Sequence, residues 1–106
     1  MGAITSPVKR YPGTVELPEA FSWDQLAQWA MDIDAIPDNA PAPVMLRAQL
    51  QAICNLGLSW HLAGIVERPQ LADIPTKPIM AAVELAGWLM REIGRAIYVE
   101  DGSPNE

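Results

Sequence analysis

Hydrophobic positions recur with helical spacing in three stretches of this chain, and clusters of proline separate the stretches from one another. The first predicted helix covers residues 23–35. Ser22, followed three residues later by Gln25, is typical of a capping box, and Pro37 cannot continue a helix. The pattern therefore predicts a well-marked first helix. Its core stripe consists of Leu26, Ala30 and Ile33.

The second predicted helix covers residues 44–66 and is apolar around most of its circumference. Its polar positions form one narrow stripe, in which every fourth residue is polar: Arg47, Gln51, Asn55 and Ser59. A helix of this kind lies either at the centre of its domain or in an interface between chains. We therefore expect other elements of the fold, or a second copy of the chain, to surround it.

The third predicted helix covers residues 78–97. Thr76 is placed to cap it, and Pro78 is tolerated in the first turn. The positions expected to be buried are Ile79, Val83, Ala86, Met90, Ile93 and Ile97. Charged residues share another face, with Trp88 in their middle: Lys77, Glu84, Arg91 and Arg95.

Residues 8–18, ahead of the first helix, alternate between two sides with the period of an extended strand. Pro12 and Pro18 restrict this segment to a short edge strand or an irregular extended arm. A single strand needs a partner, and residues 97–99 or a strand of another chain are the two candidates.

These elements predict an all-α fold, a three-helix domain with an extended N-terminal arm or short edge strand. The 106 residues are enough for one domain with one core. We expect residues 1–21 to form the arm and residues 98–106 to form a flexible tail.

Four glycines lie inside the second and third predicted helices, two in each and seven residues apart: Gly57, Gly64, Gly87 and Gly94. Glycine inside a helix costs about 1 kcal/mol relative to alanine, so two in each helix suggest a compensating gain. We interpret them as helix-packing positions, where the second and third helices approach closely. The alternative is a flexible hinge.

Trp88 is the strongest candidate for a contact with another protein, because a tryptophan surrounded by charged residues resembles an interaction hot spot. Arg91 and Arg95 would form its rim. The alternative is that Trp88 folds back under the N-terminal arm or stacks on one of these arginines. On the arm itself, the side chains expected to contact a partner are Tyr11, Val15 and Leu17.

Catalytic and metal-binding signatures are missing from the sequence. Cys54 and His61 are the single cysteine and histidine, which is too few for a zinc site. Ser59 has no glycine-flanked elbow, and no glycine-rich phosphate loop is present. We therefore predict a protein that is not an enzyme and needs no cofactor and no metal.

The net charge of −6 is uneven, since no basic residue occurs between Arg10 and Arg47 whereas six acidic residues do. Nucleic-acid binding requires the opposite sign. No apolar run reaches transmembrane length, and no signal segment opens the chain, so a cytoplasmic protein without membrane contact is expected. The acidic balance also fits a small helical inhibitor that mimics nucleic acid.

One stretch resembles a known family. Residues 11–18 and 23–29 combine an aromatic-proline-glycine strand, a leucine-proline turn and a tryptophan-bearing helix: Tyr11-Pro12-Gly13-Thr14-Val15-Glu16-Leu17-Pro18 and Trp23-Asp24-Gln25-Leu26-Ala27-Gln28-Trp29. This pattern resembles the opening of small phage tail assembly chaperones. The resemblance implies a phage-encoded protein of the host cytoplasm that binds the helical tape-measure protein, keeps it soluble and is absent from the finished virion. A homo-oligomer is compatible with this role.

Overall fold

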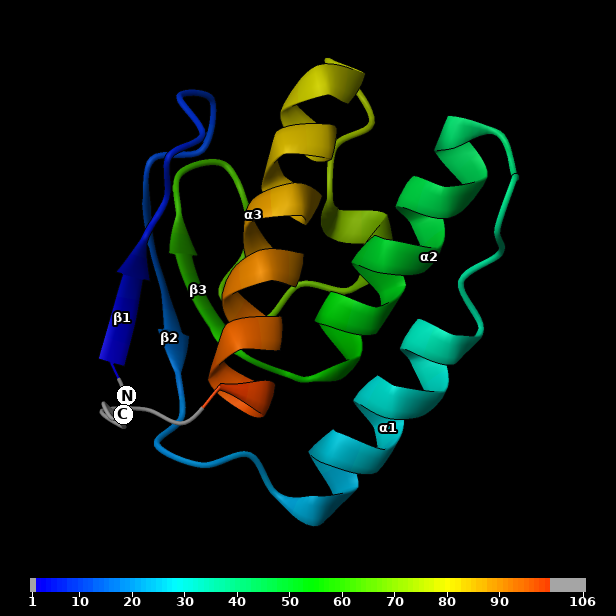
Figure 1. Cartoon of the computed structure of the whole chain (residues 1–106). Coiled ribbons are helices and arrows are strands. Elements are labelled where there is room, and N and C mark those ends of the chain that lie inside the picture. Colours follow the sequence, from blue (N-terminus) through cyan, green and yellow to red (C-terminus); the bar gives the residue numbers. More distant parts are fainter. Residues whose placement is uncertain (1, 100–106) are drawn as a thin grey trace.

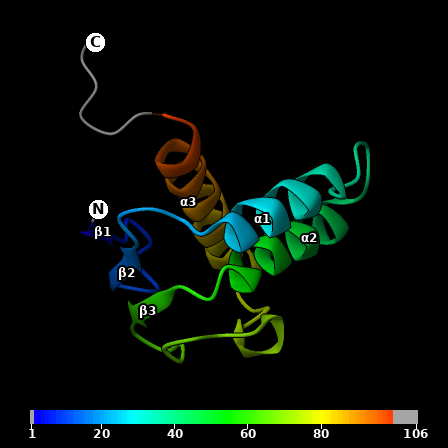
Figure 2. The ribbon, with the colours of Figure 1, turned by 90° about the horizontal axis from the view of Figure 1, so that it is seen from below.

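Residues 2–99, which the computed structural model describes, form three α-helices, a short 3-10 helix and a three-stranded antiparallel sheet (Figure 1). The prediction of an all-α domain is therefore wrong, because the fold is a mixed α/β one. Helix α3 (Ile79–Tyr98) crosses one face of the sheet, and α2 (Ala42–Asn55) and α1 (Trp23–Asp34) follow beside it. A view turned by 90° shows α1 and α2 lying side by side, away from the sheet (Figure 2).

The sheet has the order β1 (Gly2–Thr5), β2 (Gly13–Leu17) and β3 (Ser59–Leu62), with antiparallel neighbours. The arm predicted as an edge strand is thus the central strand of the sheet. Both suggested partners are wrong, because residues 97 and 98 end α3 and the actual partners come from the same chain. Pro12 and Pro18 fit this position because they lie just outside β2.

The second helix is shorter than predicted, and the rest of its expected range contains β3. Helix α2 ends at Asn55, and Gly57 follows with a φ of +68°, a conformation that terminates helices. After it, buried Leu58, Trp60 and Leu62 alternate with more exposed residues, which is the period of a strand. Trp60 lies opposite Val15 on β2, and both are fully buried.

The start of α1 is confirmed. The Ser22 hydroxyl accepts a hydrogen bond from the Gln25 backbone N–H at 3.1 Å, and the Gln25 side-chain oxygen accepts one from the Ser22 N–H at 2.9 Å. The predicted core stripe is shifted, because Trp29 is buried whereas Ala30 is exposed. Trp23, in the first turn, is 85% exposed.

Replacing Ser22 with alanine should lower the free energy of unfolding by about 1 kcal/mol, because the Gln25 N–H loses the hydroxyl that accepts its hydrogen bond. Ser22→Asp is the matched control, since its carboxylate accepts the same hydrogen bond at a favourable helix end. Urea denaturation followed by circular dichroism measures both. Equal stability of wild type and Ser22→Ala would contradict the contribution assigned to this cap.

Helix α3 covers nearly the predicted residues but is rotated about its axis relative to the prediction. Ile79 and Val83 are exposed, whereas Trp88 is buried. Thr76 is not the cap, because Pro78 occupies the N-cap position without a side-chain hydrogen bond. The buried residues of α3 are Ala81, Ala82, Leu85, Ala86, Trp88, Leu89 and Ile93. Most of the predicted tail, residues 100–106, lies outside the described residues.

Candidate functional site

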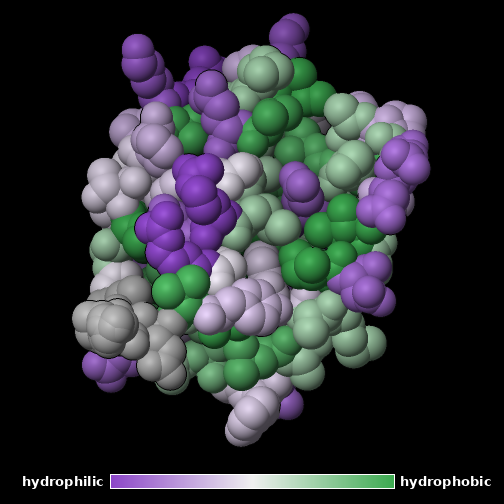
Figure 3. Space-filling view, viewed as in Figure 1, coloured by the Kyte–Doolittle hydropathy of each residue, from purple (hydrophilic) through white to green (hydrophobic). Residues whose placement is uncertain are grey.

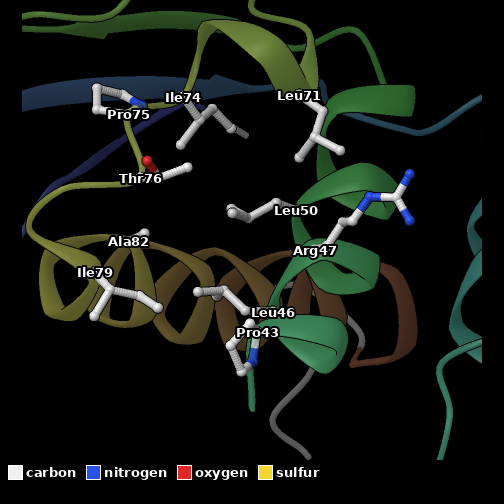
Figure 4. A pocket seen from close by; sticks show the side chains of 10 residues that line it. All are labelled: Pro43, Leu46, Arg47, Leu50, Leu71, Ile74, Pro75, Thr76, Ile79 and Ala82. Atoms are coloured by element: carbon white, nitrogen blue, oxygen red, sulfur yellow. The ribbon is translucent and has the colours of Figure 1, made fainter. Parts of the chain in front are cut away.

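An apolar groove of about 400 Å³ opens between α2, the 3-10 helix η1 (Leu71–Asp73) and the start of α3 (Figure 4). Its lining consists almost entirely of aliphatic and proline side chains. The lining residues are Pro43, Leu46, Arg47, Leu50, Leu71, Ile74, Pro75, Thr76, Ile79 and Ala82.

The first half of α2 forms one wall of this groove. Pro43, Leu46 and Leu50 follow one another at helical spacing, so they share one face of α2. In Figure 4 the side chains of Leu46 and Leu50 point into the groove, whereas the guanidinium group of Arg47 points away from it. The groove therefore meets no charge on this wall.

The opposite wall comes from the segment between β3 and α3. Its 3-10 turn is closed by the Gln70 N–H, which donates to the Asp73 carboxylate at 2.9 Å, and by the Asp73 N–H, which donates to the Gln70 carbonyl at 2.9 Å. This turn directs Leu71 and Ile74 toward α2 (Figure 4). Ile79, in the first turn of α3, completes the wall.

The floor of the groove is buried and its rim is exposed. Leu50, Ile74 and Ala82 are each 5% exposed or less, but Ile79 keeps 45% of its surface accessible. Further exposed apolar residues occur on the same two helices, namely Val44 and Val83. Hydrophobic residues reach the surface over the start of α3 and over the side formed by α1 and α2 (Figure 3). An apolar surface of this kind on a folded domain is typical of an interaction site.

The residues predicted to contact a partner lie elsewhere, and most are inaccessible. Tyr11, Val15 and Leu17 are at most 5% exposed, because the arm is the central strand of the sheet. Trp88 is 4% exposed, so it is no surface anchor. It borders a hollow together with Pro7, Val8 and Lys9, which matches the alternative of a tryptophan under the N-terminal arm.

Arg91 and Arg95, the predicted rim of Trp88, are exposed on α3. Arg95 lies 3.8 Å from the carboxylate of Glu92, one turn earlier in the same helix. Neither arginine surrounds an exposed aromatic side chain, so the predicted hot spot does not form in this fold.

The helix-packing role predicted for the glycines is also wrong. Gly57 and Gly64 lie outside the helices and have φ values of +68° and +86°, so each supports a turn. Gly87 and Gly94 do lie in α3, but a Cβ atom added at either would meet nothing within 4 Å. No close helix approach therefore depends on them.

Cys54 and His61 lie on different elements. His61, on β3, is 2.9 Å from the carboxylate of Glu16 on β2, and both side chains are exposed. Within residues 2–99, no three His, Cys, Asp or Glu side chains are close enough to hold a metal ion. Nor does any helix there have the length and apolar character that crossing a membrane requires.

Cys54 should react slowly with alkylating reagents. Burial of the side chain, followed by the nearby Asp73 carboxylate, raises the pKa of the Cys54 thiol from 9.0 to about 11. At pH 8 the thiolate fraction is therefore lower by about 100-fold than in the unfolded chain, because each pKa unit is a factor of ten. Iodoacetamide labelling at pH 8, with the chain in concentrated urea as control, measures the ratio. Equal rates in both states would contradict the burial of this thiol.

The groove was not among the sites predicted from sequence, although two signals for it were present. The first is the excess of apolar residues on α2, more than two neighbouring helices cover. The second is the pair Leu71 and Ile74 within a proline-rich connection, where polar residues are the rule. Their convergence depends on the 3-10 turn, which the sequence pattern did not reveal.

Comparisons with protein-family models, curated proteins and solved structures gave no match for this chain.

Proposed function

We propose that this chain is a non-enzymatic phage tail assembly chaperone of the host cytoplasm. In this proposal its client, the helical tape-measure protein, places an apolar segment in the groove between α2, η1 and α3. The observation that carries the proposal is the groove itself, whose lining is apolar and partly exposed. An amphipathic helix that lays its apolar face into such a groove is a recurring mode of peptide recognition.

The lining favours a protein segment over a small polar ligand. Small-molecule sites combine an apolar wall with a few convergent polar groups that fix the orientation of the ligand. Here the polar side chains of the lining are those of Thr76 and Arg47, and Arg47 points away from the groove. Apolar side chains of a helix need no such orienting groups.

Arg47 adds a chemical preference at the mouth of the groove. It is exposed, and no carboxylate of residues 2–99 lies within 4.0 Å of its guanidinium group. A client helix with an acidic residue beside its apolar stripe would pair with it. Pairs of this kind at a rim contribute mainly to orientation and to association rate.

The residues that carry the family resemblance belong to the scaffold. Residues 11–18 contain β2, and residues 23–29 form the first turns of α1. Neither segment lines the groove. In the proposed function they hold the sheet and the helical layer together, and the groove on the other elements binds the client.

The alternative, an acidic mimic of nucleic acid, has less support from the charge distribution. The six acidic residues between Arg10 and Arg47 lie on β2, in the connection after it, on α1 and beyond α1. Glu16 is next to His61, and the Asp32 carboxylate accepts a hydrogen bond from the Asn55 side chain at 2.9 Å. The acids therefore do not follow a single regular row like that of a phosphate backbone.

Co-expression with a helical tape-measure protein of a phage tail tests the proposed function. The wild-type chain should keep that protein in the soluble fraction and co-purify with it. The matched control is the tape-measure protein expressed alone, which should aggregate. Failure to co-purify, combined with capture of a host nucleic-acid enzyme, would replace this function with the inhibitor alternative.

A further inference from the structure

The two edge strands of the sheet differ in whether another part of the chain covers their outer backbone groups. On the outer side of β3, the Trp60 N–H donates to the Glu67 carbonyl at 2.7 Å, so the following loop covers part of that edge. The outer side of β1 has no such cover among residues 2–99, and three of its four residues are exposed. An uncovered edge strand offers its backbone groups to another strand.

The register of the sheet identifies which backbone groups point outward. The Ser6 N–H donates to the Gly13 carbonyl at 2.9 Å, and Ile4 lies opposite Val15 two residues further along. Because hydrogen-bonded pairs alternate in an antiparallel ladder, Ile4 bonds to β2. The N–H and C=O groups of Ala3 and Thr5 therefore point away from β2, toward the open edge.

We propose that the β1 edge binds the β1 edge of a second copy of this chain. The two strands would run antiparallel about a two-fold axis at Ile4. Ala3 of each copy would then lie opposite Thr5 of the other, and each of the two pairs would exchange both N–H···O bonds. The two Ile4 side chains would meet across the axis on the face that carries α3.

Several properties of β1 favour a second copy as the occupant. Its two outward-bonding residues are placed symmetrically about Ile4, so the strand is complementary to itself, as a two-fold interface requires. Residues 2–5 contain neither proline nor charge, the usual protection of an edge strand. Ile4 is only partly buried against the core, so contact with its symmetry mate removes further apolar surface from water.

The surroundings of β1 extend this surface. A hollow of about 170 Å³ lies between β1 and the end of α3, and side chains of both signs border it, Glu92 and Arg95. Each copy therefore places one acidic and one basic side chain beside the two-fold axis, so both partners in the interface carry charges of both signs. The buried area is nevertheless small, so we expect a weak dimer with a dissociation constant of about 10–100 µM.

This dimer has a consequence for the proposed client. In Figure 1 the β1 edge lies at one side of the molecule, and α2, which forms one wall of the groove, lies on the other side of α3. Pairing through β1 therefore leaves both grooves open on one six-stranded assembly. Two linked grooves bind a long client with repeated apolar segments more tightly than one groove does.

Sedimentation velocity of the full chain between about 5 and 500 µM tests the proposal through a pair of matched variants. Ala3→Lys with Thr5→Lys places like charges opposite each other and should weaken the dimer by about tenfold. Ala3→Lys with Thr5→Glu places opposite charges there and should retain it. A wild-type chain that stays monomeric over this range would overturn the proposal, and so would two variants that dimerise equally.

Cysteine crosslinking tests the register independently of affinity. In a Cys54→Ala background, Ile4→Cys should form a disulfide-linked dimer with oxidised glutathione, because residues opposite each other in a non-hydrogen-bonded pair are close enough for a disulfide. Ala3→Cys is the control and should crosslink at least about tenfold more slowly, because Thr5 lies opposite it. Equal crosslinking at both positions, or none at Ile4→Cys, would contradict this interface.

Discussion

Replacing Gly13 with alanine should destabilise the fold by about 3 kcal/mol or more, the largest effect expected of any single methyl group here. Gly13 has a φ of +132°, which other residues rarely adopt. A Cβ atom at this position would run into the backbone carbonyl of His61 on β3. Backbone cannot move aside as a side chain can, so the β2–β3 ladder must open. Urea denaturation measures the loss.

Gly87→Ala is the matched control for Gly13→Ala and should have the opposite sign. Nothing lies within 4 Å of the added methyl group on α3, and alanine favours the helix by up to about 1 kcal/mol. The same glycine-to-alanine substitution thus distinguishes a position whose backbone conformation requires glycine from a position whose backbone conformation does not. A destabilised Gly87→Ala together with an unaffected Gly13→Ala would contradict the fold described here.

Ile79→Asp should weaken binding of the client by at least about tenfold, because it removes an apolar side chain from the rim and introduces a charge into an apolar groove. Its effect on folding should be small. Ile79 is 45% exposed, and an acidic residue in the first turn of a helix interacts favourably with the helix dipole. Isothermal titration with the purified client segment measures the change.

Met80→Asp provides the control for charge and position. Met80 is 62% exposed in the same turn of α3 but does not line the groove. Its substitution introduces the same charge one residue away and should change the affinity by less than about threefold. If both variants bind as tightly as wild type, the client binds elsewhere on the molecule.

Local signals along the chain predicted α1 and the approximate limits of α3. The capping box of Ser22 and Gln25 involves neighbouring residues only, so it survives in any tertiary context. The rotation of α3 could not be predicted in this way. Its apolar residues extend well beyond one narrow stripe, so its orientation depends on which side the sheet covers, and the sheet itself was not expected.

The sequence pattern does not predict the sheet, because its strands are short and β3 lies within an apolar stretch that continues from α2. The segment containing Trp60 follows α2 almost without a polar interruption, so its apolar residues also fit the spacing of a continuing helix. Gly57 was the available signal for the end of α2. Once β3 pairs with β2, the arm becomes central, which is why Tyr11, Val15 and Leu17 are buried rather than available to a partner.

The candidate site depends on contacts between residues far apart in sequence. Leu46 and Ile79 border one groove although 33 positions separate them, and the 3-10 turn at residues 71–73 brings a third element between them. Hydrophobic periodicity describes one element at a time and contains no information on such convergence. The burial of Trp88 likewise depends on distant residues. Its place among charged residues on α3 predicts an exposed side chain, but the N-terminal arm packs near it and Trp88 is buried.

A nuclear magnetic resonance titration of the labelled chain with helical peptides that cover a tape-measure protein tests most directly whether the groove binds a client. We expect one or more peptides to shift the methyl signals of Leu46, Leu71 and Ile79 together, with little change at Val15 or Trp60 in the sheet. Shifts confined to the acidic surface of α1, or no shift with any peptide, would contradict a client-binding groove.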